Sequence, residues 1–171
     1  MGRRALAAAA LVSLAALGGC AGSVLLEPGP FAPDPVCGEI LLQLRGDRFG
    51  LSEVSTDAQA TMAWGDERNA VVVRCGVEPP PPTTDRCIEV TGSDGGRIDW
   101  INPEGDSPLI PRHADTEFGS WTFLTYGRTP AVEVVVPSAL QLEPADVLQV
   151  VAPAVQRAPV ERECVGATDV N

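Results

Sequence analysis

The side chains in this sequence that are best suited to bind a ligand are two arginines near aromatic residues. Arg74 and Arg128 each stand at the end of an apolar run. A guanidinium beside aromatic rings can hold a carboxylate or phosphate, or stack on a sugar. Trp64, Asp66 and Tyr126 lie close to these arginines in the sequence. Together the five residues form the possible ligand-binding set.

A structural role for the same residues is the alternative that we favour. Arginines that end apolar strands usually pair with internal carboxylates, and Asp66 and Glu133 are available for such pairs. The tryptophans, Trp100 and Trp121 included, are then expected to belong to the core. Arg74 follows the β-branched run Val71–Val73, which is typical of a central strand covered on both faces.

The single histidine lies in an alternating polar run. His113, Asp115 and Glu117 would share one face of a strand and could then bind a metal or perform acid–base chemistry. Because Pro108 and Pro111 precede this run and no apolar residue forms a strand pattern within it, we favour a solvated polar loop.

Other catalytic and metal-binding patterns are weak. Neither Ser107, Ser120 nor Ser138 lies in a G-x-S-x-G elbow, which argues against a serine hydrolase. Four carboxylates near glycines could bind calcium, but their spacing does not match an EF-hand and suits hairpin turns. These are Asp94, Asp99, Glu104 and Asp106. We therefore predict no catalytic residue, no metal and no cofactor.

The cysteine count indicates an oxidising compartment. If Cys20 is lipidated, Cys37, Cys75, Cys87 and Cys164 remain, and an even number in an exported domain predicts two disulfides. Three connectivities are possible. We favour Cys75 with Cys87, across the Pro79–Pro82 connection between strands taken to be neighbours, and Cys37 with Cys164.

The N-terminus has the layout of a bacterial lipoprotein leader. Arg3 and Arg4 precede an apolar stretch that ends in Leu17-Gly18-Gly19-Cys20, so residues 1–19 are expected to be a signal peptide and Cys20 the lipidated residue. Residues 20–34 are rich in proline and glycine, and they are expected to form an extended tether. We expect a single domain over residues 35–165, followed by a tail over residues 166–171.

The charge of the chain limits its partners. The net charge is −11, and cleavage of a leader that contains Arg3 and Arg4 would take it to −13. Nucleic acid is a poor partner for such a chain, because phosphate binding needs clustered positive charge. The expected partners are the membrane, through the lipid anchor, and an envelope protein or cell-wall component. The expected location is the extracytoplasmic face of the cell membrane.

The periodicity of the sequence predicts two helices and six strands. Asp34 and Pro35 begin the first helix, which ends at Gly46. The second helix contains Val147 to Val151, and Pro153 should end or kink it. Strands are expected at 62–64, 70–75, 87–91, 97–101, 118–126 and 131–136, with hairpin loops at 92–96 and 127–130. This order predicts an α+β fold, a two-layer sandwich whose mainly antiparallel sheet carries both helices on one face.

Three motifs add a family resemblance. The segments AWGD, VVVRCGVEPP and YGRTPAVEVVVP, behind a lipoprotein-type leader, resemble the DUF3515 family, an actinobacterial family of secreted or lipid-anchored proteins of unknown function. The resemblance covers Cys37 to Cys164, although the segment from Ile101 to Phe118 departs from the family pattern. It implies no activity and no catalytic residues. We expect a lipid-anchored binding or accessory module, with an envelope hydrolase using Asp66, Arg74 and Arg128 as the alternative.

Overall fold

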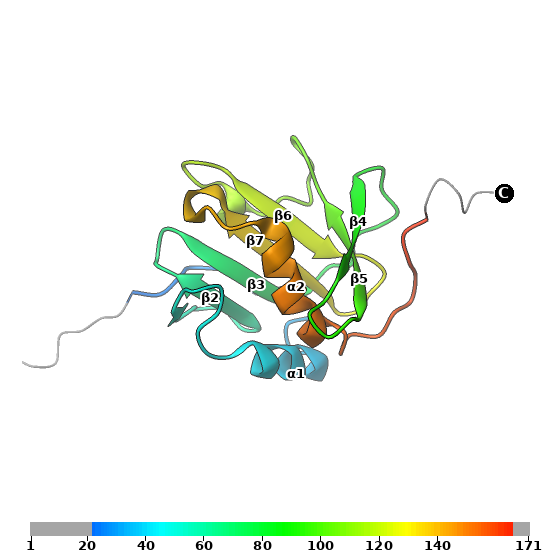
Figure 1. The fold of residues 1–171 in the computed structure, drawn as a ribbon, viewed down its shortest axis with the longest axis horizontal. Helices are drawn as coiled ribbons and strands as arrows, with labels where there is room; N and C mark the ends of the chain where they lie inside the picture. Colours follow the sequence, from blue (N-terminus) through cyan, green and yellow to red (C-terminus); the bar gives the residue numbers. More distant parts are fainter. Residues whose placement is uncertain (1–21, 166–171) are drawn as a thin grey trace, which may run out of the picture.

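The computed structural model describes residues 22–165, so the predicted signal peptide, Cys20 and the predicted tail at 166–171 lie outside the described residues. Seven strands form one antiparallel sheet in the order β1-β2-β3-β7-β6-β5-β4, with two α-helices (Figure 1). The elements are α1 (Pro35–Leu44), β1 (Glu53–Val54), β2 (Thr61–Gly65), β3 (Ala70–Val77), β4 (Arg86–Thr91), β5 (Arg97–Asn102), β6 (Ser120–Thr125), β7 (Ala131–Pro137) and α2 (Pro144–Val155). The fold is therefore α+β and mainly antiparallel sheet, as predicted.

The central strands β3 and β7 are apolar on both faces of the sheet. Val73 of β3 and Val134 of β7 belong to the main core cluster, which also contains residues of α1 and α2. Their neighbours Val72 and Val135 belong to a second cluster. Because successive strand residues point to opposite faces, the two clusters lie on opposite sides of the sheet. We call the side with Val72 and Val135 the second face.

Helix α1 begins as its sequence predicts. The Asp34 side chain accepts a hydrogen bond of 2.8 Å from the backbone N–H of Val36, and Pro35 occupies the first turn. Ile40 and Leu44, one turn apart on the same helical face, are buried in the main core. This helix contacts both α2 and β3.

Helix α2 continues past Pro153, which the sequence predicted would end or kink it. Proline has no N–H and cannot bond to the carbonyl of the residue four positions earlier. That carbonyl, of Gln149, instead accepts a hydrogen bond of 3.1 Å from the backbone N–H of Ser93 in the β4–β5 hairpin. The hairpin therefore satisfies the carbonyl that Pro153 leaves free, and α2 ends only at Val155.

The described part of the predicted extended tether, residues 22–34, lies against the domain instead. We call residues 22–34 the strap. The backbone N–H of Val24 donates to the Ser55 carbonyl at 2.9 Å, and the N–H of Phe31 donates to the Gly76 carbonyl at 2.8 Å. Gly29 is buried, and a Cβ there would approach the Gly76 carbonyl oxygen to 2.2 Å. Two glycines thus allow the strap backbone to touch β3.

The predicted disulfide pairing is wrong. The bridges join Cys37 to Cys75 and Cys87 to Cys164, with Cα–Cα distances of 5.4 and 6.4 Å. The error came from treating β3 and β4 as neighbours, whereas β7, β6 and β5 lie between them. Four interstrand spacings amount to about 19 Å, well beyond the reach of a disulfide. The prediction that all four cysteines are paired agrees with the structure.

Candidate functional site

A buried ion pair lies at the centre of the second face. Arg74 on β3 and Glu133 on β7 are direct cross-strand partners. The Arg74 Nε and Nη2 atoms donate to the two carboxylate oxygens of Glu133 at 3.0 and 2.9 Å. The side chains are 14% and 2% exposed, so the pair is largely removed from water. Of the two carboxylates proposed for Arg74 from the sequence, Glu133 is its partner and Asp66 is not.

His113 joins this pair from the long loop between β5 and β6. It lies in a short 3-10 helix at Arg112–Ala114, and its Nε2 atom is 3.1 Å from Oε1 of Glu133. The ring N–H is not directed at that oxygen, and Nε2 has no hydrogen-bond partner among residues 22–165. With a side chain that is only 15% exposed, His113 does not lie in a solvated loop, contrary to the sequence-based interpretation.

The local sequence explains why His113 turns inward. Ala114 follows it and is buried on the second face, in the cluster that contains Val72 and Val135. The Ala114 carbonyl also accepts a hydrogen bond of 2.6 Å from the Ser120 hydroxyl at the start of β6. These contacts hold the loop against β7, so that the residue before Ala114 faces Glu133.

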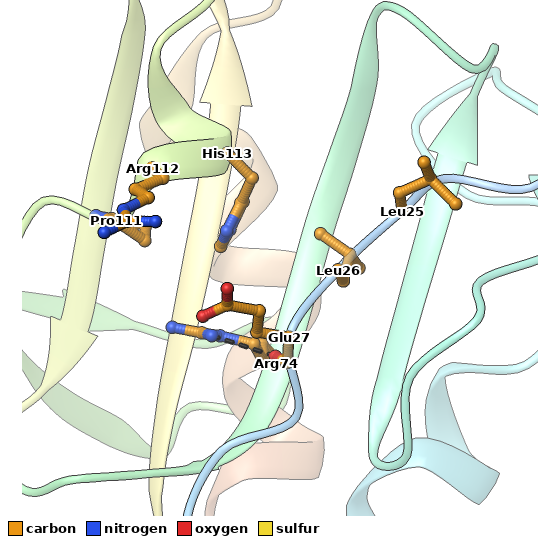
Figure 2. Close-up of a pocket in the computed structure, with 7 residues that line it drawn as sticks. All are labelled: Leu25, Leu26, Glu27, Arg74, Pro111, Arg112 and His113. Atoms are coloured by element: carbon orange, nitrogen blue, oxygen red, sulfur yellow. Dashed lines mark hydrogen bonds between the residues drawn. The ribbon is translucent and has the colours of Figure 1, made fainter.

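A pocket of about 640 Å³ opens between this loop and the strap. Figure 2 shows Glu27 of the strap, with its carboxylate in the space between Arg74 and His113, while Arg112 and Pro111 face the pocket from the loop. Leu26 adds an apolar wall from the strap side. The pocket therefore combines one carboxylate, two guanidinium groups and one imidazole, from three segments far apart in the sequence.

Arg74 has little remaining capacity to bind a ligand. Besides its two bonds to Glu133, its Nη1 atom donates to the Glu27 carbonyl at 2.9 Å. In contrast, the Glu27 carboxylate and the Arg112 guanidinium form no ion pair among the described residues. The groups of this pocket that stay free for a ligand are therefore Glu27, Arg112 and His113.

The five residues of the predicted ligand-binding set do not meet in one cleft. Trp64 is fully buried in the main core, on the opposite side of the sheet from Arg74, and its Nε1 donates to the Gly46 carbonyl at 2.8 Å. Asp66 lies at the β2–β3 turn, where its carboxylate accepts bonds from the backbone N–H groups of Arg68 and Asn69. These bonds lower the pKa of Asp66 below its ordinary value.

The remaining two residues, Arg128 and Tyr126, line a separate pocket of about 330 Å³ beside the Cys87–Cys164 bridge. Arg128 is 7% exposed and donates to the Ala158 carbonyl at 2.6 Å. Burial lowers the pKa of its guanidinium, and the nearby Asp99 carboxylate opposes that shift. Because Arg128 bonds to the segment after α2, it has a structural role in fastening the C-terminal segment.

Carboxylates proposed as calcium ligands make structural contacts. Asp94 accepts a bond from the Gly96 N–H within its own hairpin turn, at 3.1 Å, and Asp99 accepts one from the Cys164 N–H at 2.8 Å. Asp99 also lies close to the sulfurs of Cys87 and Cys164, but those sulfurs are joined to each other. Of these three residues, only Asp99 can offer an oxygen ligand, and one of its two carboxylate oxygens already accepts the Cys164 N–H.

Sequence reasoning identified Arg74 but missed Glu27 and Arg112. Glu27 lies in a proline-rich and glycine-rich stretch that resembles a linker, and Arg112 lies in a loop without periodicity. One available signal was Gly76 after Cys75, since a glycine inside a strand often marks the close approach of another backbone. That approach is made by the strap, which also carries Glu27.

Comparison with known families places this chain in a family described as being of unknown function. The family model described as "Protein of unknown function (DUF3515)" matches residues 5–163. The chain therefore belongs to the DUF3515 family. No curated protein and no solved structure matches the chain. Within the described part of the chain, we find no helix of the length and apolarity needed to cross a membrane.

Proposed function

We propose that this protein is a lipid-anchored binding module at the outer face of the cytoplasmic membrane, and that it takes a small zwitterionic ligand between Glu27 and Arg112. The observation that carries the proposal is that one pocket is lined by two opposite charges that form no ion pair with any described residue. The anchor rests on the Leu17-Gly18-Gly19-Cys20 sequence. It also rests on the four other cysteines, whose pairing suits an oxidising compartment.

The chemistry of the pocket favours a ligand that carries both an amine and a carboxylate. An ammonium group suits the Glu27 carboxylate, and a carboxylate suits the planar donors of Arg112. Leu26 and Pro111 offer apolar contact to a short side chain between the two ends. An amino acid or a short peptide with free termini has this distribution of charge.

We also propose that α1 and α2 form a single layer on one face of the sheet. Residues of both helices share the main core cluster with Val73 and Val134, and α2 (orange) crosses in front of the central strands in Figure 1. This arrangement leaves the second face to the strap and the β5–β6 loop.

An envelope hydrolase is the second candidate. The His113 ring beside Glu133 supports it, because a carboxylate next to an imidazole is a common acid–base arrangement. The residues for such chemistry would be His113 and Glu133 rather than Asp66 and Arg128, which the fold places elsewhere. No serine, threonine or cysteine is among the described residues that line this pocket, so a hydrolase of this kind would have to activate water.

Calorimetric titration of the purified full-length protein with alanyl-alanine tests the binding proposal. Two blocked forms of the dipeptide, one N-acetylated and one C-amidated, each remove one terminal charge. We expect the free dipeptide to bind, and each blocked form to bind at least about tenfold more weakly, because each loses one charged contact. Equal binding of all three forms would contradict the zwitterion proposal. Release of free alanine during the titration would favour the hydrolase.

Matched variants assign the two charges to their residues. Glu27→Gln and Arg112→Gln should each weaken binding of the free dipeptide, whereas Glu39→Gln on α1 and Arg86→Gln on β4 should not, since both control residues are exposed and lie outside the pocket. The anchor is tested separately by fractionating cells that express Cys20→Ala. If this variant remains in the membrane as wild type does, the lipid anchor is wrong.

A further inference from the structure

We infer that the strap holds the second face of the domain against the membrane, so that Leu25 contacts the lipid and the Glu27–Arg112 pocket opens beside the bilayer. This inference rests on the lipidation of Cys20 in the proposed function. It adds an orientation and an interaction surface, whose partner is the lipid surface itself.

The strap is fastened to the domain almost from its first described residue. Val24 pairs with Thr56 in a parallel bridge, and the Leu26 N–H donates to the Asp57 carboxylate at 2.8 Å. Gly22 already lies against Glu67, whose carboxylate a Cβ at that position would meet. The first residues of the strap are therefore already held on the second face.

The chain length between the lipidated residue and this attachment is short. Four peptide units separate Cys20 from Val24, and they span at most about 14 Å when fully extended. A diacylglycerol on the Cys20 sulfur places that residue at the membrane interface. The attachment point at Val24 must then lie within about 14 Å of Cys20, much less than a free tether over residues 20–34 would allow.

The exposed side chains near this attachment point suit a lipid surface. Leu25 is 74% exposed, which makes it the most exposed large apolar side chain among the described residues. Arg68 lines a pocket together with Ser23 and Leu25, and Arg112 lines the neighbouring pocket with Leu25. The Arg68 guanidinium, which lines a pocket with Leu25, can contact lipid phosphates while the leucine enters the interface.

This orientation determines how a ligand reaches the pocket. The strap forms one wall of the pocket, so its mouth is near the membrane. The helix side, which carries the exposed Leu42 on α1, then faces away from the lipid. A ligand at Glu27 and Arg112 would enter from the space just above the bilayer, rather than from the far side of the domain.

Photocrosslinking in native membranes tests the orientation. A benzophenone amino acid is placed at position 25 and, in a separate control variant, at position 42, whose leucine is 67% exposed. We expect irradiation to add the mass of a phospholipid to the position-25 protein, with at least a tenfold lower yield at position 42. Equal yields, or a higher yield at position 42, would overturn the inference.

A linker insertion tests whether the short chain sets the orientation. About 20 Gly/Ser residues inserted after Ala21 extend the mean reach by about 25 Å. Lipid crosslinking at position 25 should then fall toward the position-42 value, while the protein still fractionates with membranes. Unchanged crosslinking at position 25 would overturn the inference and leave the anchor intact. Membrane retention of Cys20→Ala would overturn the anchor and, with it, the orientation.

Discussion

Arg74 and Glu133 are direct partners across the central strands β3 and β7, joined by two hydrogen bonds of 3.0 and 2.9 Å. They lie between apolar neighbours on both strands, and Glu133 is almost completely buried. The pair also supports the pocket, because Arg74 holds the Glu27 carbonyl and Glu133 contacts His113. One ion pair therefore links the sheet, the strap and the β5–β6 loop.

Removal of one partner of this pair should destabilise the protein strongly. Arg74→Ala leaves the Glu133 carboxylate buried without its cation, which typically costs about 3 to 5 kcal/mol of folding free energy. Urea unfolding followed by circular dichroism gives this value. An Arg74→Ala variant that unfolds at the same urea concentration as wild type would show that the pair contributes nothing.

An apolar double variant separates the charge effect from the loss of packing. Arg74→Met with Glu133→Leu removes both charges and keeps similar side-chain volumes, so its stability should recover most of the loss seen for Arg74→Ala. The strap should then lose the bond to the Glu27 carbonyl, and binding of alanyl-alanine should weaken even where stability recovers.

Local patterns predicted the elements of the fold, but they did not predict its long-range pairings. The Asp34 cap, the apolar β3 run and both hairpins depend on neighbouring residues, and the structure contains each of them. Strand order depends on the insertion of β7 between β3 and β6. The spacing of apolar residues along the sequence does not predict which strands become neighbours. The wrong disulfide pairing followed from that missing information. The two-residue strand β1 was also too short to detect.

The candidate site was only partly predictable for the same reason. Arg74 and Glu133 lie on strands that the sequence predicted, and Glu133 was one of two carboxylates proposed as partners. Glu27, Arg112 and His113 come from segments that we predicted to be a tether and a loop, and only tertiary contacts bring them to one pocket. Asp66 was proposed because it is close in sequence, whereas its carboxylate bonds to the backbone of its own turn.

The two disulfides should differ in their resistance to reduction of the native protein. Cys37 and Cys75 are both 0% exposed, whereas Cys87 and Cys164 are half-buried beside a pocket. A thiolate reductant must reach a sulfur atom to attack it. Mild reduction without denaturant, followed by alkylation and peptide mapping, should therefore label Cys87 and Cys164 first. Earlier labelling of Cys37 and Cys75 would contradict this order.

Loss of the Cys87–Cys164 bridge should leave the domain folded but less stable. In the chain-entropy model each of the two bridges contributes about 4 kcal/mol, and Arg128 still holds the Ala158 carbonyl when this bridge is open. Thermal melts of the Cys87→Ser, Cys164→Ser double variant should show a lower midpoint with a cooperative transition. A non-cooperative melt would show that the bridge is needed for a folded core.

Asp66 should make part of the stability depend on pH in the acid range. Its pKa is lowered in the folded protein by hydrogen bonds from the Arg68 and Asn69 N–H groups. The unfolded chain then binds a proton more readily than the folded one. The contribution of Asp66 is therefore present above its ordinary pKa of 3.8 and is lost as the pH falls through the lower, folded value.

The variant Asp66→Asn isolates this contribution, because the amide keeps an acceptor for the turn but does not titrate. Wild type should be more stable than the variant at a pH of about 6, and this difference should shrink at a pH of about 2.5. Melting midpoints of both proteins across this range provide the measurement. A difference that grows toward acid pH would reverse the sign and contradict the lowered pKa.

Two glycine-to-alanine substitutions should change stability in opposite directions. At Gly29 a Cβ would lie 2.2 Å from the Gly76 carbonyl oxygen, so the strap must move away from β3. At Gly38, inside α1, a Cβ has no atom within 4 Å, and alanine in a helix interior gains about 1 kcal/mol over glycine.

Gly29→Ala should therefore lower the melting midpoint and weaken binding of alanyl-alanine, because displacement of the strap also moves Glu27. Gly38→Ala should raise the midpoint and leave binding unchanged. If Gly29→Ala melts like wild type and binds the dipeptide equally well, the contact between the strap and β3 does not position the pocket.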